Sequence, residues 1–360
     1  MNVANSSPMQ RGAQWDVLAG PNEEQGTPEK AIHIHIRSWM RWAFGMRRIG
    51  KRQYANLSAI TDCTLSPLNK PIATARPGET VQIETFDCFG DTIRPGKGLA
   101  EALKEGVEML HNVATGPVYI EGAEAGDTLL VEILEFELPS LGVTTTVPGF
   151  GALEGWLTET PALTRFSEIH GGKVTFRLGD SRPVKIDIHP FVGTIGVAPA
   201  SESIPTTTPG KHGGNMDAPD VCKGNTLRLP VAVKGALFSL GDVHVVQGDG
   251  EICGTAVEVP AVVTVRFGLE KGRKIEWPRI ESPDEIMTVC SARPLEDAAR
   301  LAFREMIRLL EADYCVNQYD AYMLLSLTAT ARIAQIVDPL YTVVVKLQKK
   351  YLRQLRQETA

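Results

Sequence analysis

The 360-residue chain lacks the marks of several protein classes. Its six cysteines never stand at C-x-x-C spacing, which excludes a zinc ribbon and a dithiol redox motif. No apolar run reaches the ~18 residues that span a bilayer, and the first residues lack the apolar core of a signal peptide. A formal net charge of −6 leaves no basic excess for nucleic acid. We therefore expect a cytoplasmic protein with reduced thiols that binds neither nucleic acid nor membrane.

Two common catalytic signatures are also missing. The chain has neither the G-x-S-x-G nucleophile elbow nor the H-E-x-x-H zinc motif. The glycines near residues 150 and 248 do not open a helix in a β-α-β unit, so nucleotide binding is not expected.

Turns and alternating strands dominate residues 70 to 265. The turn Arg76-Pro-Gly-Glu79 precedes the alternating stretch 80–86, and Glu124-Ala-Gly-Asp127 precedes the stretch 128–134. Two such units favour a β-sandwich or barrel. Further strands are expected over 174–178, 184–188, 226–233 and 256–267.

The C-terminal quarter changes to helical periodicity. Leu295, Ala298, Ala302, Met306 and Leu309 share one face of a helix over 295–310. A second helix is predicted to begin after the N-cap Asn317, to continue through Ile333, and to stop before Asp338-Pro339. The prediction is a mainly β fold with added helices: a sandwich or barrel body with a C-terminal helical pair.

Three regions are expected from these shifts in composition. Residues 1–60 form an N-terminal basic and aromatic arm, 61–280 a β-rich catalytic body, and 281–360 an α+β part packed on that body. The stretch 36–52 carries six basic residues and no acid. It is either a membrane-surface helix or a segment that docks on the body or a sister subunit, and Gly45 and Gly50 favour docking.

The densest group of chemically active side chains lies in Gly241–Glu251. If its valines form a strand, Asp242 and His244 project from one face, and the glycines allow Asp249 and Glu251 to return toward the same space. These are ligand types for a divalent cation. A plain Gly/Asp-rich turn with a surface histidine is an equal alternative.

Two further sites of interest precede this stretch. The loop Lys211–Asp217 lies between prolines and presents Asn215 and Asp217 in a shaped turn. Asp87 follows the first strong strand; it is a candidate ligand, but its chemistry alone favours a turn former or a helix cap.

Several motifs together resemble the acetamidase/formamidase family. They are Thr115-Gly-Pro-Val-Tyr-Ile-Glu-Gly-Ala-Glu-Ala-Gly-Asp127, residues 193–200, 213–217 and 235–256, and the helical stretch 321–338. The resemblance spans about 70–350 and implies hydrolysis of a short linear carboxamide to ammonia and a carboxylate, on the β-sandwich of that family. It also favours a functional role for His244 and Asp217.

Two hydrolytic routes fit these residues. In the first, Asp87, Asp217 and His244 hold a divalent metal, expected to be Zn²⁺ with Ca²⁺ as the alternative, and the catalytic groups are His244, Glu251 and Asp217, with Glu251 as general base and then acid. In the second, Cys253 is a nucleophile activated by His244 or Glu251. The first is preferred because Cys253 follows Ile252 in a strand-like apolar run.

The remaining expectations concern ligands and partners. Asn215, Gln247 and Glu121 are expected to bind the substrate, and the protein is expected to be a homo-oligomer. The family pattern is not kept over 61–70, so we expect an amide other than formamide, larger or carrying a negative charge that arginines could meet. A non-catalytic β-sandwich with a structural Ca²⁺ loop is the alternative of another class.

Overall fold

The computed structural model describes residues 46–51, 63–106, 112–157, 159–179 and 182–357. The chain divides into two compact units, Met1–Met46 and Arg47–Ala360, and the described helices and strands all belong to the second. Except for its last residue, the first unit lies outside the described residues, as do most of the expected basic arm and positions 52–62.

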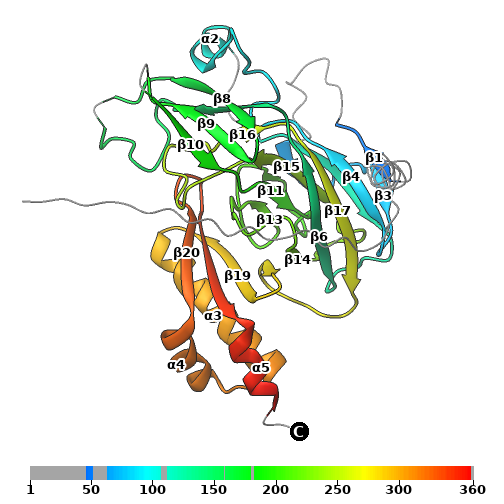
Figure 1. Ribbon diagram of the computed structural model, residues 1–360. Helices are drawn as coiled ribbons and strands as arrows, with labels where there is room; N and C mark the ends of the chain where they lie inside the picture. Colours follow the sequence, from blue (N-terminus) through cyan, green and yellow to red (C-terminus); the bar gives the residue numbers. More distant parts are fainter. Residues whose placement is uncertain (1–45, 52–62, 107–111, 158, 180–181, 358–360) are drawn as a thin grey trace, which may run out of the picture. The chain divides into compact units, whose positions relative to one another are not determined.

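A nine-stranded sheet forms one half of the body (Figure 1). Its strands, in spatial order, are β1 (Arg47–Ile49), β4 (Thr80–Glu84), β17 (Val262–Glu270), β6 (Thr128–Glu137), β14 (Thr226–Pro230), β18 (Arg279–Glu281), β19 (Glu285–Ala292), β21 (Tyr341–Gln348) and β20 (Thr330–Gln335). The strands after residue 281 thus extend the sheet that the body begins.

A ten-stranded sheet forms the other half, and a short two-stranded sheet accompanies it. The larger sheet contains β10 (Pro183–Asp187), β9 (Lys173–Arg177), β8 (Thr164–His170), β7 (Leu141–Thr145), β16 (Glu258–Val259), β15 (Phe238–His244), β11 (Phe191–Gly196) and β13 (Gly213–Asn215), with β5 (Ala114–Ile120) paired to β15 and β3 (Ala73–Ala75) paired to β5. The small sheet pairs β12 (Ile204–Pro205) with β2 (Thr64–Leu65).

The two large sheets pack through one apolar core. Phe238 of β15 and Phe267 of β17 meet edge to face, with ring centroids 5.2 Å apart, and side chains from both sheets join the same buried cluster. This arrangement confirms the predicted sandwich, because the inward residues of both sheets exclude water together. The predicted turns are also present: the N–H of Glu79 bonds to Arg76 and that of Asp127 to Glu124.

The helical pair is confirmed, but its second member is shorter than predicted. The helices are α2 (Leu99–Lys104), α3 (Leu295–Tyr314), α4 (Gln318–Thr328) and α5 (Lys349–Gln357). Ala298, Ala302 and Met306 of α3 are fully buried in a second core, which packs on the C-terminal strands. None of the helices in the described ranges is both long and apolar enough to cross a membrane.

Two expected elements have different boundaries. Ile333 lies on β20 and not on a helix, because α4 ends at Thr328 and the next residues pair antiparallel with β21. The single strand expected over 256–267 is two strands, β16 and β17, in different sheets. Pro260 separates them, since a proline has no N–H for a sheet ladder.

Candidate active site

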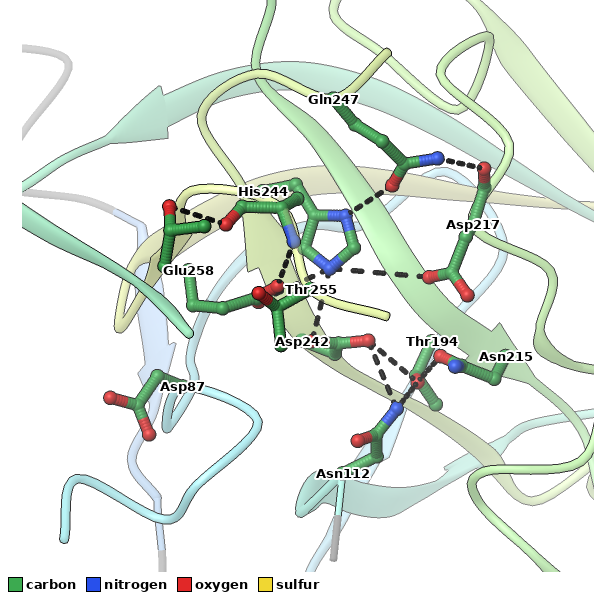
Figure 2. Close-up of polar contacts among 12 residues, drawn as sticks. Asp87, Asn112, Thr194, Asn215, Asp217, Asp242, His244, Gln247, Thr255 and Glu258 are labelled. Carbon is green, nitrogen blue, oxygen red and sulfur yellow. Dashed lines mark hydrogen bonds and ion pairs between the residues drawn. The ribbon is translucent and has the colours of Figure 1, made fainter. Parts of the chain in front are cut away.

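Strand β15 places the first two functional side chains. Asp242 and His244 are two residues apart and project from the same face, as the sequence predicted. Their Oδ1 and Nε2 atoms lie 3.2 Å apart, and both residues are almost completely buried (Figure 2). The imidazole also meets the ring of Phe191 edge to face, on the neighbouring strand β11.

Gln247 fixes the orientation of the imidazole. Its side-chain Nε2 donates to the backbone carbonyls of Asp217 and Ala334, at 3.1 and 3.0 Å. Its Oε1 must therefore face Nδ1 of His244, 2.7 Å away, and that nitrogen carries the proton. In a neutral ring, this tautomer leaves a bare lone pair on Nε2.

Three carboxylates surround that nitrogen. Nε2 lies 3.2 Å from Oδ1 of Asp242, 3.2 Å from Oε2 of Glu258 and 4.0 Å from Oδ1 of Asp217. Glu258 arrives from β16, where it pairs with His244 across the sheet, and Asp217 follows β13. A lone pair among anionic oxygens is repelled, so this arrangement requires a proton or a cation at Nε2.

The backbone of the site is strained. Asn112, Asp217, Asp242 and Glu251 all have positive φ, between 38° and 55°. Such angles are uncommon outside glycine and gather where function requires them. Gly193 of β11 is needed for the close approach, because a Cβ atom there would lie 2.6 Å from Oδ1 of Asp217 and 2.8 Å from Oδ2 of Asp242.

Amide and hydroxyl groups hold two of the acids. Nδ2 of Asn112 donates to Oδ2 of Asp242 at 3.1 Å, and the Thr194 hydroxyl lies 3.3 Å from the same oxygen. Nδ2 of Asn215 donates to Oδ2 of Asp338 at 2.9 Å, while its Oδ1 accepts from Thr194. These bonds orient Asp242 and Asp338 toward the cluster.

Burial and mutual repulsion shift the titration of these groups. Burial, then the charges of Asp338 and Asp242, raise the pKa of Asp217 well above its usual range. Burial, then Asp217, does the same to the pKa of Glu251, and burial also raises the pKa of Glu258. Burial lowers the pKa of His244, but Glu258 and Asp242 outweigh it and raise that pKa. The cluster therefore holds protons, or a cation replaces them.

A cavity of about 190 Å³ opens on this cluster. Its lining residues are Cys88, Asn112, Phe150, Thr207, Asn215, Asp242, His244, Glu251, Gly254, Glu258, Asp338 and Pro339. No lysine or arginine is among these described lining residues, so the cavity is acidic.

Three overlapping groups could hold a metal ion. They are Asp217, Asp242 and His244; His244, Glu251 and Glu258; and Cys88, Asp242 and Glu258, each with ligand atoms within 4.8 Å of one another. Both carboxylate oxygens of Asp217 are buried and have no hydrogen-bond partner among the described residues. Burying carboxylate oxygens without a partner is energetically costly, and a bound cation would offset that cost.

The structure gathers most of the predicted site residues. Asp217, His244 and Glu251 lie together, Asn215 lines the cavity, and Gln247 contacts His244. Glu121 does not join them: it is exposed beyond the end of β5 and pairs with Arg76 at 2.9 Å. Its expected role in substrate binding has no support from its position.

Asp87 lies close by but outside these groups (Figure 2). One of its oxygens accepts the backbone N–H groups of Phe89 and Asp91, at 3.0 and 2.7 Å, as a turn former does. Burial, opposed by these bonds, raises its pKa to about 7.

Asp249 and Cys253 also lie apart from the cluster. Asp249 lies outside the site, although the glycines beside it would allow its return: its side chain is 57% exposed and pairs with Arg332. The Cys253 thiol donates to the carbonyl of Thr255 at 3.2 Å, and Cys253 does not line the cavity.

Sequence reasoning missed Asn112, Glu258 and Asp338 and did not choose Asp242 as a ligand. Asp242 carried a signal, because it stands two residues before His244 on one strand. The other three reach the site through pairing and packing between distant segments, such as the register of Glu258 opposite His244. No local pattern reports such contacts.

Comparison with known proteins finds one matching family and matching solved structures. The model of the acetamidase/formamidase family matches residues 66–206 and 200–349. A crystal structure of an acetamidase from Bacillus halodurans superposes with a TM-score of 0.76 at 36% identity, covering 86% of this chain and 99% of that one.

Two curated relatives are more distant. A formamidase of Methylophilus methylotrophus is 28% identical over 56% of this chain and 61% of its own length. An acetamidase of Mycolicibacterium smegmatis is 26% identical over 56% of this chain and 63% of its own length. The chain thus matches about three-fifths of the length of these relatives.

Proposed function

Because the chain belongs to the acetamidase/formamidase family, we propose that it hydrolyses a short linear carboxamide to ammonia and a carboxylate. The observation that carries this proposal is the buried imidazole and carboxylate cluster at the small cavity. An amide is stabilised by resonance and has a poor leaving group, so its hydrolysis needs an activated nucleophile, a site for the oxyanion and a proton donor.

We propose that a divalent cation belongs to this cluster, with Zn²⁺ preferred over Ca²⁺ because an imidazole is among the donors. Asp217 and His244 would hold it as the sequence suggested, with Asp242 in place of Asp87, whose oxygen serves two backbone N–H groups. The unpartnered oxygens of Asp217 and the lone pair on His244 fit such an ion. When bound, a divalent cation lowers the pKa of a coordinated water toward ~7.

Glu251 is the proposed proton carrier. It lines the cavity, and burial raises its pKa well above its usual range, so its carboxyl group holds a proton more readily than a free glutamate and can give it to the departing nitrogen. Gln247 acts as a positioning residue, since all its described hydrogen bonds serve His244 and two backbone carbonyls.

The substrate proposed is a neutral amide. The lining carboxylates would repel an anion, and no lysine or arginine lines the described cavity to attract one. A benzene molecule fits an engineered cavity of about 150 Å³, so the present cavity suits amides of a few heavy atoms. Of the two expectations drawn from the sequence, this favours an amide larger than formamide over an amide that carries a negative charge.

The test is ammonia release from formamide, acetamide and propionamide, before and after removal of metal. We expect a chelator to abolish release and Zn²⁺ to restore it, whereas thiol alkylation leaves it intact. Loss on alkylation with no effect of the chelator would favour Cys253 as the nucleophile.

His244→Ala should lower kcat/KM by about 100-fold or more, because the ring carries both the proposed metal contact and the link to Gln247. Circular dichroism and a thermal melt check that the variant is folded. Retention of more than about a tenth of the rate would remove His244 from the reaction.

We further propose that the protein forms a homo-oligomer through helix α4. Tyr319, Tyr322, Met323 and Leu327 recur at helical spacing and are 58 to 84% exposed. They offer an uncharged strip on the order of 500 Å², a large part of the ~800 Å² that each partner buries in a standard interface. A second copy of the chain is the proposed partner, because a strip on one helix can pair with the same strip of another copy across a two-fold axis.

A further inference from the structure

Phe150 supplies the one phenyl ring among the lining residues of the described cavity. Eight of the twelve lining residues are polar or charged, and Phe150, Pro339 and Cys88 are the apolar side chains among the rest. An amide substrate has a polar end and, beyond formamide, an alkyl group. The polar end suits the acids and the imidazole, which leaves the alkyl group to the apolar wall.

The loop that carries Phe150 is fastened to the loop that carries Glu251. At its base, the N–H of Thr145 donates to the Thr255 hydroxyl at 3.0 Å, and that hydroxyl donates back to the Thr145 carbonyl at 2.8 Å. Farther along, the N–H of Ala152 donates to the carbonyl of Ile252 at 2.9 Å. Phe150 therefore has a defined position at the cavity although it lies on a loop.

Gly254 makes room for the ring. Its φ is +81°, and a Cβ atom at this position would lie 2.4 Å from Cδ1 and Cε1 of Phe150. The N–H of Gly254 also donates to the carbonyl of Glu251 at 2.8 Å, so the ring rests on the turn that presents Glu251. Only glycine allows both the backbone angle and this contact.

We propose that Phe150 is the specificity-determining wall against which the acyl substituent of the amide packs. The inference rests on the proposed function and deepens it by naming the side chain that selects among neutral amides by the length of their alkyl chain. Contact with the ring favours acetamide and propionamide over formamide, because each buried methyl or methylene group gains apolar contact. The ring also limits the chain length, because it lines a cavity of only about 190 Å³.

The test compares Phe150→Ala and the milder Phe150→Leu with the unaltered protein on formamide, acetamide, propionamide, butyramide and hexanamide. Trp156→Ala is the matched control, since Trp156 lies on the same loop but is 86% exposed and does not line the cavity. A thermal melt checks folding. We expect the ratio of kcat/KM for hexanamide to that for acetamide to rise about tenfold or more in Phe150→Ala, less in Phe150→Leu, and not in Trp156→Ala.

Calorimetric titration of the same amides separates this inference from the proposed function. If the unaltered protein binds the amides but releases no ammonia, the proposed function fails, and a shift of binding toward longer amides in Phe150→Ala still supports the wall. An unchanged ranking of the amides in both Phe150 variants overturns the wall even when hydrolysis is normal. Absence of amide binding to the unaltered protein overturns it as well.

Discussion

At the scale of single residues, Asp217 and Asp249 are both aspartates in glycine-containing loops, but their surroundings are opposite. The Asp217 side chain is 1% exposed and faces the cluster, whereas that of Asp249 is 57% exposed and pairs with Arg332. Replacing an aspartate by asparagine keeps its shape and removes its charge. The same change at the two positions therefore distinguishes a carboxylate that acts as a ligand from one that only lies at the surface.

We expect Asp217→Asn to lower kcat/KM for acetamide by about 100-fold, because a buried charge that His244 or a cation needs is lost. Asp249→Asn should stay within about threefold of the unaltered protein, since a surface ion pair contributes little. Steady-state kinetics with a folding check decide. Equal losses at the two positions would mean that Asp217 has no special role in the reaction.

His212 supplies a pH-dependent contribution to stability. Burial lowers its pKa from 6.5 to about 4, opposed by a hydrogen bond to the Thr208 backbone. The folded state therefore binds the proton less well than the unfolded chain. The contribution is fully present above pH 6.5 and is lost as the pH falls toward 4, by about 3 kcal/mol.

Replacing this histidine by a group that does not titrate should remove that loss. We expect the free energy of unfolding of His212→Gln to fall less than that of the unaltered protein between pH 7 and 4.5, by about 2 to 3 kcal/mol. Urea denaturation at both values measures the difference, and His170→Gln, at an exposed histidine, controls for the substitution itself. If the free energy of unfolding falls equally in His212→Gln and in the unaltered protein, His212 is not the source of this pH dependence.

At the scale of elements, helix α4 depends on its N-cap. The Asn317 side chain accepts the N–H groups of Tyr319 and Asp320, both at 3.1 Å, which have no carbonyl partner inside the helix. Asn317→Ala should reduce the free energy of unfolding by about 1 kcal/mol, and Asn317→Ser should restore most of it. Urea denaturation provides the measurement, and an alanine variant as stable as the serine variant would contradict the role of the cap.

The elements also show which boundaries local sequence patterns predict and which depend on tertiary structure. The cap at Asn317 and the buried face of α3 were readable from the sequence, because capping and helical periodicity are local properties. The end of α4 was not. The segment 330–335 becomes a strand because β21 offers it a pairing partner, and that partner lies on a different stretch of chain.

At the scale of the whole molecule, the α4 strip makes the assembly state testable. Within the strip, Leu327 is 84% exposed and Tyr322 is 65% exposed. We expect light scattering to give a multiple of the 39.2 kDa chain mass for the unaltered protein, and the mass of one chain for the double variant Tyr322→Glu and Leu327→Glu. A buried pair of glutamates in a symmetric interface costs more than the apolar contact provides.

Trp156→Glu is the matched control, because it adds a charge at another exposed apolar residue outside the strip. It should leave the mass unchanged. An unaltered protein with the mass of one chain, or dissociation by Trp156→Glu alone, would show that α4 is not the interface.

The class of fold, the family and about half of the site were predictable from the sequence. Alternation, turn residues and helical periodicity are properties of neighbouring residues, so the sandwich strands and α3 could be predicted from them. The pair Asp242 and His244 followed from the same period of two, and Glu251 from the glycines beside it.

The other acids of the site are brought there by contacts between distant parts of the chain. Glu258 reaches His244 through strand register, Asn112 reaches Asp242 from before β5, and Asp338 reaches Asn215 from the far end of the chain. The tertiary structure also places Asp217 in the buried cluster and places Asp249 and Glu121 at the surface. Sequence patterns indicate which side chains share a face of a strand or helix. The pairing of distant strands decides which of these faces come into contact, and this contact brings the charged side chains of the site together.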